Sequence, residues 1–352
     1  MRLRGSVVAG IALAIALLGQ GACGGGSSPS SPTPAPQPAP QPAPPPTPPP
    51  APTERWTVSG RVIALGDGRP VGGAQVTSEV GPATQTDAAG AFRLGSATNP
   101  EFTPHGFTVD APGFLTRRAY VRWQAGLREN VAVDLISMAA PFSLEFYRAL
   151  VRGTHDEPTG MEPLRRWTTN PRFYVRSADQ NGRAIEPEVM SVVLGTIPDA
   201  VRQFTGGRLS VAQLESGPET RAPTFGWITV NIIRDMSLPY CGVAYIAQDP
   251  GDITLVNDRC NCGSVKLSGR LVAHEVGHAL GFFHVPGDRN VMFDTHPQGC
   301  PAGNLSDAER FHAAIAYQRP PGNRDPDLDP RTTEAQQIRS RAADRPIVCG
   351  LR

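Results

Sequence analysis

The sequence predicts an α+β domain that follows a separate all-β sandwich. Short alternating strands separated by turns fill residues 54–138, whereas strands and helices are interspersed in residues 139–352. A third observation is the run His274–His284, in which two histidines recur at helical spacing. Ahead of the two folded parts we expect an exported leader, residues 1–23, and a proline-rich stalk, residues 24–53.

The leader has the features of a secretory signal peptide. Two arginines precede the apolar run Val7–Leu18, which is too short for a comfortable transmembrane span. Gln20-Gly21-Ala22-Cys23 then resembles a bacterial lipoprotein processing site, and this resemblance implies that Cys23 is lipidated and anchors the protein to a membrane. Cleavage and release is the alternative. We therefore expect an exported protein, located in the bacterial cell envelope or outside the cell.

The stalk holds 14 of the 37 prolines within residues 24–53. Such a segment cannot bury a core and favours extended polyproline II, at about 3.1 Å per residue. We interpret it as a spacer between the membrane and the folded part, with a ligand for a proline-binding domain as the alternative.

Residues 54–138 alternate between apolar and polar positions in short runs. Strands are expected at Trp56–Val62, Ala74–Thr77, Phe92–Leu94, Phe107–Asp110, Tyr120–Trp123 and Val131–Leu135. Four motifs carry a resemblance to the carboxypeptidase-regulatory-like, prealbumin-type module: Gly60-Arg61-Val62, Pro70–Ala74, Thr86–Phe92 and Ala111–Phe114. The resemblance implies a β-sandwich with an accessory role and no catalysis of its own.

In residues 139–352 the spacing of apolar residues changes between the two-residue period of strands and the 3.6-residue period of helices. Strands are expected at Arg172–Arg176, Arg208–Leu214, Phe225–Ile233, Val243–Ile246 and Ile253–Val256. Glu186–Phe204 has helical periodicity, and Leu305-Ser306-Asp307-Ala308-Glu309 has the look of a capping box that starts a helix to about Tyr317.

Residues 274–284 have the pattern of a catalytic zinc site. His274 and His278 are four apart on a helix, so they can offer two imidazole nitrogens to one tetrahedral zinc ion. Glu275 would lie beside the open position of the metal, where it can act as a base. Gly281 permits a turn with positive φ that returns His284 as third ligand, which leaves the fourth position for water. The alternative is a buried helix whose histidines only make hydrogen bonds.

The helix that carries this motif has an apolar back for core packing. The residues that form it are Leu271, Val272, Val276, Ala279 and Leu280. Ser268 or Ser264 is expected to cap its start. Gly277 costs about 1 kcal/mol relative to alanine inside a helix, so we interpret it as a point of close backbone packing.

Beyond a Pro286-Gly287 turn, Met292 stands eight residues after His284. With this spacing the chain resembles the metzincin zinc peptidases, most closely the matrixin-like branch. The resemblance implies one catalytic zinc on His274, His278 and His284, Glu275 as catalytic base, Met292 in a Met-turn, and protein or peptide substrates. An ordinary core methionine is the alternative for Met292. Where some branches carry a tyrosine, Asp294 stands here, so no tyrosine ligand is expected.

The same resemblance implies the architecture of the α+β domain. The order strand, helix, strand, strand and zinc helix fits the metzincin upper subdomain, a twisted mixed sheet with helices behind it. In that family the edge strand of the sheet binds an extended substrate by backbone pairing. Which strand forms the edge in this chain is not evident from the sequence.

The remaining candidates are weaker. Basic and acidic residues number 33 and 32 and are scattered, which does not support nucleic-acid binding. Five cysteines follow Cys23, so export predicts disulfides with one cysteine left over: Cys241, Cys260, Cys262, Cys300 and Cys349. Cys260-Asn261-Cys262 as a metal site is a minor alternative, and no cysteine-switch inhibitor is expected. His155, His296 and His312 are interpreted as surface or structural. A turn-rich acidic tail is favoured over structural calcium for Asp325, Asp327 and Asp329.

Together these observations predict an exported, surface-anchored zinc endopeptidase with Glu275 as general base for a zinc-bound water. Two other functions stay open. One is a catalytically silent surface-binding or adhesion protein on the same scaffold, and the other is a zinc hydrolase that acts on non-peptide amides.

Overall fold

The computed structural model describes residues 56–79, 81–96, 105–121, 127–258, 266–295, 303–331 and 346–350. The chain divides into two units, residues 1–51 and 52–352, and every described residue belongs to the second. The leader, the stalk, Cys23, three further cysteines and His296 therefore lie outside the described residues. None of the helices in the described ranges is both long and apolar enough to cross a membrane.

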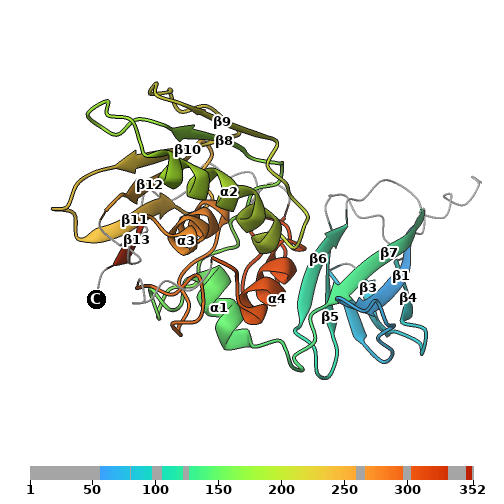
Figure 1. The fold of residues 1–352 in the computed structure, drawn as a ribbon. Coiled ribbons are helices and arrows are strands. Elements are labelled where there is room, and N and C mark those ends of the chain that lie inside the picture. Colours follow the sequence, from blue (N-terminus) through green and yellow to red (C-terminus); the bar gives the residue numbers. More distant parts are fainter. Residues whose placement is uncertain are drawn as a thin grey trace, which may run out of the picture. The chain divides into compact units, whose positions relative to one another are not determined.

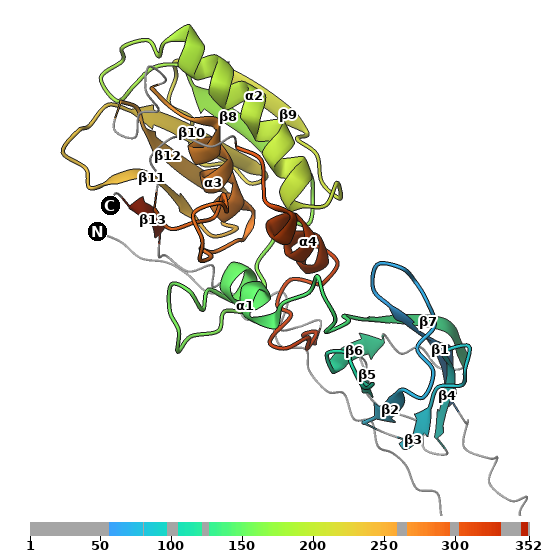
Figure 2. The same ribbon diagram turned by 60° about the horizontal axis from the view of Figure 1, so that its bottom comes forward.

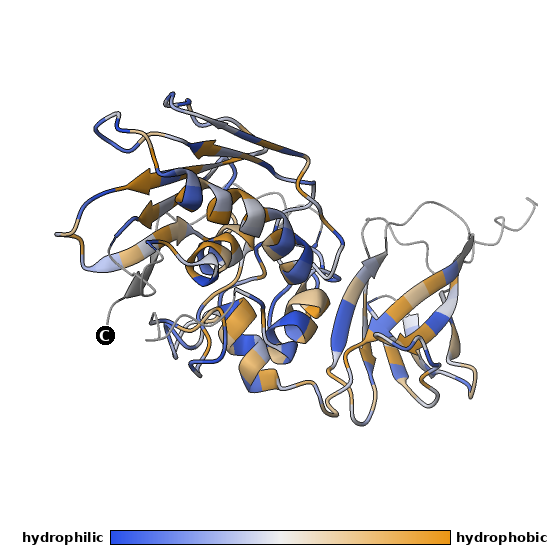
Figure 3. Ribbon diagram, in the orientation of Figure 1, coloured by the Kyte–Doolittle hydropathy of each residue, from blue (hydrophilic) through white to orange (hydrophobic). Residues whose placement is uncertain are grey.

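The N-terminal strands form two sheets (Figure 1). One has the order β4-β1-β7, with β1 (Trp56–Ala64), β4 (Ala91–Ser96) and β7 (Leu127–Leu135). The other has the order β3-β2-β5-β6, with β2 (Gln75–Ser78), β3 (Gly81–Gln85), β5 (His105–Asp110) and β6 (Arg117–Val121). Val62, Val76 and Val109 are fully buried in a core that these strands share. Figure 3 shows apolar and polar residues alternating along the strands, as a sheet with one buried face requires.

Most of the expected strands in this part are confirmed. β3 was missed because Gly81-Pro82-Ala83-Thr84-Gln85 has no apolar alternation; it pairs antiparallel with β2, with Gln75 opposite Gln85. The edge position explains its composition, since an edge strand buries little and tolerates a proline.

The rest of the described chain forms a six-stranded mixed sheet with the order β13-β11-β12-β10-β8-β9. Its strands are β8 (Arg172–Arg176), β9 (Gln213–Gly217), β10 (Trp227–Ile233), β11 (Tyr240–Tyr245), β12 (Gly251–Val256) and β13 (Pro346–Gly350). β9, β8, β10 and β12 run parallel, whereas β11 is antiparallel to both of its neighbours. The expected mixed sheet is confirmed.

Four described helices accompany this sheet: α1 (Leu144–Arg152), α2 (Pro187–Phe204), α3 (Gly269–Leu280) and α4 (Asp307–Ala316). Figures 1 and 2 show α2 and α3 side by side over one face of the sheet. Val193 and Ile197 of α2, Val276 of α3, and Ile228 and Leu255 of the sheet are all fully buried in one apolar core. The fold is thus α+β, with its largest core between the sheet and these helices.

Two expectations in this part need correction. The strand expected at Arg208–Leu214 is wrong, because β9 begins only at Gln213. The Thr205 hydroxyl both accepts from Leu209 N at 3.1 Å and donates to the Val201 carbonyl at 2.8 Å, so the chain after α2 is held in a turn. Helix α1 was missed, although Ser143 caps its start and Gly153, with φ 72°, ends it.

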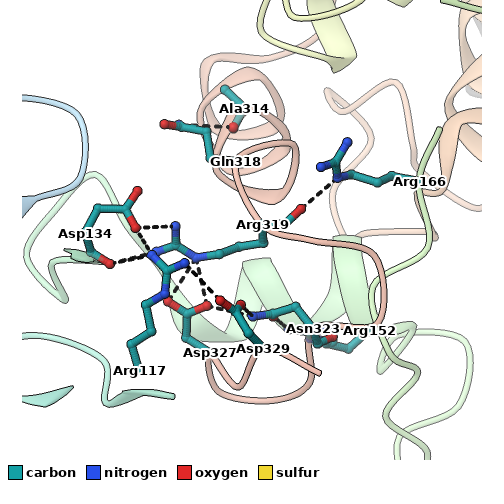
Figure 4. A network of polar contacts seen from close by, with 10 residues as sticks. All are labelled: Arg117, Asp134, Arg152, Arg166, Ala314, Gln318, Arg319, Asn323, Asp327 and Asp329. Carbon is teal, nitrogen blue, oxygen red and sulfur yellow. Dashed lines mark hydrogen bonds and ion pairs between the residues drawn. The ribbon is translucent and has the colours of Figure 1, made fainter. Parts of the chain in front are cut away.

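A buried polar network surrounds Arg319 (Figure 4). Arg319 and Asp327 are both fully buried, and Nε of Arg319 lies 2.8 and 3.0 Å from the two carboxylate oxygens of Asp327. Asn323 donates to Asp327 and to Asp329 at 2.9 Å each. Nη1 of Arg319 lies 3.0 Å from Asp134 at the end of β7. Each buried charge therefore has an opposite charge or an amide within hydrogen-bonding distance.

The three aspartates after α4 are parts of ion pairs. Asp325 accepts from Arg148 at 2.8 and 2.7 Å, Asp329 accepts from Arg117 at 3.0 Å, and Asp327 binds Arg319. The expected turns are present at residues 321–322 and 325–327, and Asp327 and Asp329 of this segment are buried. Arginine guanidinium groups, rather than solvent, neutralise these carboxylates.

Glu186 at the start of α2 gives a prediction about stability and pH. Its carboxylate lies 2.9 Å from Lys266 Nζ and 2.8 Å from Arg234 Nη2. The hydrogen bond from Lys266, together with the Arg234 charge, lowers the pKa of Glu186 from 4.5 to about 2. A lowered folded-state pKa stabilises the fold above the unfolded-state pKa, and this stabilisation is lost as the pH falls from about 4.5 toward 2.

We expect Glu186→Gln to lower the free energy of unfolding at pH 6 by no more than about 1 kcal/mol, since the side chain is 27% exposed and solvent screens the pair. The difference from the unmodified protein should shrink as the pH is lowered to 3. Urea unfolding at both pH values measures it, with Glu188→Gln at an exposed position of the same helix turn as control. A difference that is the same at pH 6 and pH 3 would contradict the prediction.

Candidate metal centre

Helix α3 presents the histidine motif from within the core. Ser268 caps the helix, with its Oγ accepting from Leu271 N at 3.2 Å, which decides between the two expected caps. Gly277 is a point of close packing, as predicted, because a Cβ there would overlap with Met292 Sδ and Phe204. Every residue from Arg270 to Leu280 is buried. The position of the motif is therefore set by packing on all sides of the helix.

Gly281 ends α3 in the way the sequence predicted. It has φ 116° and ψ 15°, and its N–H donates to the His278 carbonyl at 2.9 Å. A side chain at this position would overlap with the Arg165 carbonyl oxygen, so only glycine fits. Phe283 N then donates to the Leu150 carbonyl of α1 at 2.8 Å, which fixes the segment that leads into His284.

The three imidazoles converge. Their Nε2 atoms are 3.0 Å apart for His274 and His278, 3.2 Å for His278 and His284, and 3.3 Å for His274 and His284. Nitrogens bound at 2.0–2.1 Å to one tetrahedral zinc ion lie about 3.3 Å apart. The three rings are at most 3% exposed. This cluster could hold a metal ion.

Hydrogen bonds on the other ring nitrogens fix the orientation of each imidazole. Nδ1 of His274 lies 2.7 Å from the Val291 carbonyl, and Nδ1 of His278 lies 2.8 Å from the Phe282 carbonyl. Both carbonyls can only accept, so these Nδ1 atoms carry the proton and the Nε2 lone pairs face the centre of the cluster. Burial, together with the two neighbouring imidazoles, lowers the pKa of His278 well below 6.5, which keeps that ring neutral. Converging lone pairs in a buried site are an arrangement that can bind a metal cation.

Asp156 was missed by the sequence analysis. Its Oδ1 lies 2.6 Å from Nδ1 of His284, and its Oδ2 accepts from His284 N at 3.2 Å. Partial burial opposes ionisation of Asp156, but the hydrogen bonds and charge of His284 outweigh it and lower the pKa of the carboxyl. No spacing in the sequence links two residues that are 128 positions apart. A weak signal was its place just after Gly153, the left-handed residue that ends α1.

The Glu275 carboxylate is buried beside the cluster without a hydrogen bond to any described residue. Glu275 is 0% exposed, and both of its oxygens lack a partner. The carboxylate lies against β11, where a Cβ at Gly242 would overlap with Oε1. Burial raises the pKa of Glu275 well above 4.5. A buried carboxylate without a hydrogen-bond partner is rare in folded proteins, which makes Glu275 a candidate functional group.

Met292 is fully buried beneath the helix turn that carries His274 and His278. Its N–H donates to Oε1 of Glu309 at 2.7 Å, and Oε2 of the same carboxylate accepts from Ser306 N. The predicted capping box of α4 is confirmed, and its glutamate also holds the Met292 turn. The Glu309 contact was not evident from the sequence.

His155 and His312, whose side chains the structure describes, do not join the cluster. His312 is buried, with Nδ1 2.7 Å from the Ala308 carbonyl and Nε2 accepting from Ser143 N at 2.9 Å, which confirms a structural role. His155 faces Asp294, with Nε2 and Oδ2 3.7 Å apart. Cys241 is fully buried on β11, and its pairing stays a prediction.

No family model and no curated protein matches the sequence. Among solved structures, metalloproteinase-II from Bacteroides fragilis is 11% identical over 73% of this chain and 84% of its own, with a TM-score of 0.30. A protein of unknown function from the same organism is 18% identical over 24% of this chain, with a TM-score of 0.20. A chain of a cohesin–X-dockerin complex from Acetivibrio cellulolyticus is 19% identical over 23% of this chain, with a TM-score of 0.18.

The match spans only 29% of the Bacteroides protein of unknown function and 56% of the cohesin–dockerin chain. At these identities and TM-scores, the function has to be inferred from the geometry of the site itself.

Proposed function

We propose that this protein is a zinc-dependent endopeptidase. The observation that supports the proposal most strongly is the convergence of three imidazole Nε2 atoms within 3.3 Å of one another, beside a buried carboxylate without a partner. Neutral imidazoles suit zinc, and three protein ligands with an open fourth position are typical of catalytic rather than structural zinc sites.

The residues present have distinct tasks in peptide hydrolysis. Zinc bound by His274, His278 and His284 would act as a Lewis acid that lowers the pKa of water and polarises the scissile carbonyl. Glu275 accepts a proton from the attacking water and delivers it to the leaving amine. Met292 packs against Gly277, beneath the helix turn that carries two of the imidazoles.

Metal analysis and a peptide library test the proposal. The purified protein should contain one zinc ion per chain and should cut peptides in the library, as read by mass spectrometry. A chelator should abolish the cleavage, and added zinc should restore it. Zinc without cleavage of any peptide would favour the silent binding protein. An uncut library together with cleavage of small amides would favour the non-peptide amide hydrolase.

Asp156 is expected to position the third metal ligand. Asp156→Ala should weaken zinc binding by about 10- to 100-fold, because His284 loses the acceptor that orients its ring. Asp156→Asn should lose less zinc affinity than Asp156→Ala, because an amide oxygen can still accept from Nδ1 of His284. Competition with a chromophoric chelator measures both affinities. Equal zinc affinity in the alanine variant and the unmodified protein would contradict this role.

We also propose that the protein is exported and lipid-anchored through Cys23, with the sandwich as an accessory module. The support is the leader sequence alone. In cells, Cys23→Ser should move the protein from the membrane fraction to the medium or the periplasm, and an unchanged membrane fraction would contradict the anchor.

A further inference from the structure

Residues 323–329, here called the clasp segment, follow α4 and pair with the sandwich. The Arg118 N–H of β6 donates to the Asp327 carbonyl at 3.2 Å, and Asp329 N donates to the Arg118 carbonyl at 2.9 Å. Arg118 and Leu328 thus form a parallel bridge, and β6 is the last strand in the order β3-β2-β5-β6. The sandwich and the clasp segment belong to the same compact unit of the chain. The clasp segment therefore extends a sheet of the sandwich.

Ion pairs reinforce this junction. Nη2 of Arg117 lies 3.0 Å from Asp329, and Nη1 of the same guanidinium donates to the Asp134 carbonyl at 2.8 Å. Arg319, just after α4, lies 3.0 Å from Asp134 and 2.8 Å from Asp327 (Figure 4). The side chains of Arg117 and Asp329 are each only 11% exposed. Because a buried charge is costly without its partner, these pairs hold the clasp segment against the sandwich.

The other end of the clasp segment binds α1. Nη2 of Arg152 donates to Oδ1 of Asn323 at 2.6 Å, and Nη1 donates to the Asn323 carbonyl. Arg152 is 0% exposed. Arg148, one turn earlier, donates to both carboxylate oxygens of Asp325, at 2.8 and 2.7 Å. Asn323 also donates to Asp327 at 2.9 Å, so one network joins α1 to the residues that bind the sandwich (Figure 4).

The end of α1 in turn fixes the chain around the third histidine. The Leu150 carbonyl accepts from Phe283 N at 2.8 Å. Gly153, which ends α1, lies against the Phe283 ring, where a Cβ would approach Cδ1 to 2.9 Å. Asp156, three residues further, binds both Nδ1 and the backbone N–H of His284. A shift of α1 would therefore move both the backbone and the orienting carboxylate of His284.

The other two ligands depend on a different element. His274 and His278 lie on α3, and their Nδ1 atoms contact the carbonyls of Val291 and Phe282. A displacement of α1 would thus move His284 relative to two ligands that α3 carries. Metal affinity falls when the group that orients one ligand is disturbed. The position of α1 is for this reason a property of the metal centre.

We propose that the sandwich supports the metal centre: through Arg117, the clasp segment and Arg152 it holds α1, and thereby His284, where the metal binds. Arg117 and Arg152 are then positioning residues that contact neither the metal nor a substrate. This inference rests on the zinc site of the proposed function but does not require peptide cleavage. It gives the accessory module a specific task.

Zinc affinity of the full mature chain, measured by competition with a chromophoric chelator, tests the support. Arg117→Met should weaken zinc binding by about three- to thirtyfold, the range for residues that act on a site through a packed network. Arg117→Lys keeps a cation between Asp134 and Asp329 and should recover most of the affinity. The matched control is Arg69→Met, because Arg69 forms an exposed pair with Asp67, with side chains 63% and 61% exposed. This control should leave the affinity unchanged.

Hydrogen exchange distinguishes positioning from a general loss of stability. Coupling between two sites is reciprocal, so a junction that favours zinc binding is itself stabilised by zinc. Added zinc should slow exchange at least about threefold in peptides that cover Arg118 and Asp329. In Arg152→Met it should slow exchange only around His284. Zinc that protects the peptides of the junction equally in both proteins, or in neither, would overturn the inference.

Failure of this inference differs from failure of the proposed function. Equal zinc affinity in Arg117→Met and the unmodified protein would overturn the inference even if the protein cuts peptides. Weaker zinc binding by Arg117→Met, with recovery in Arg117→Lys, would support it even if no peptide is cut. An unmodified protein that binds no zinc would overturn both.

Discussion

Glu275→Ala is expected to lose at least about a hundredfold in peptide cleavage while retaining the metal. General acid–base catalysis contributes about 10²- to 10⁴-fold, and within the described part of the chain Glu275 is the carboxylate buried directly beside the three imidazoles. The three imidazoles keep their carbonyl and Asp156 contacts in the variant, so the metal site should persist. Initial rates on a library-derived peptide, together with metal analysis, measure both properties.

The same residue gives a contrasting expectation for stability. Both Glu275 oxygens are buried without partners and the pKa is raised, so ionisation of this carboxylate costs free energy in the fold. Glu275→Gln preserves the shape of the side chain and removes its charge, so the melting temperature of this variant should equal or exceed that of the unmodified protein.

For the cleavage measurement on Glu275→Ala, His278→Ala is the matched control, since it should lose the metal as well as the peptide cleavage. Undiminished cleavage by Glu275→Ala would refute the assignment of the base.

Arg319→Met is expected to lower the free energy of unfolding by about 3–5 kcal/mol. Removal of one partner from a buried ion pair leaves an uncompensated buried charge, here on Asp327, which is 0% exposed. Asn323 would remain as a donor to Asp327, but a neutral amide does not replace a guanidinium at 2.8 Å. Urea unfolding followed by circular dichroism measures the change.

Arg202→Met is the matched control for Arg319→Met. Arg202 pairs with Asp199 at 2.7 Å, but their side chains are 67% and 59% exposed. An exposed pair contributes little, so the control should change the free energy of unfolding by less than about 1 kcal/mol. If both variants lost the same small amount, the buried network would have no special role in stability.

The geometry around α3 was largely predictable because it depends on local periodicity. A spacing of four residues aligns His274 with His278 on one helix face, and Gly281 was expected to have positive φ. Close packing at a glycine, which has no side chain, was also predictable, as Gly277 shows. A strand with clear alternation, Trp227–Ile233, was predicted to within two residues of its start.

Elements failed where their stability comes from distant partners. The strand expected at Arg208–Leu214 failed for a local reason instead: the Thr205 hydroxyl, four residues away, accepts from Leu209 N, and the strand begins only at Gln213. The aspartates after α4 are buried because Arg319, Arg117 and Arg148 meet them from separate parts of the chain. The sequence predicted turns in this acidic segment but not these arginine partners.

The sequence by itself predicted the helix that carries His274, Glu275 and His278 and the turn at Gly281 that leads to His284, because residues within one or two helical turns have positions dictated by backbone geometry. Only the tertiary structure decided that Asp156 orients His284, that Glu309 holds the Met292 turn, and that Pro346–Gly350 covers the edge of β11. Those contacts join segments far apart along the chain, and they form only when packing of the apolar core brings the segments together.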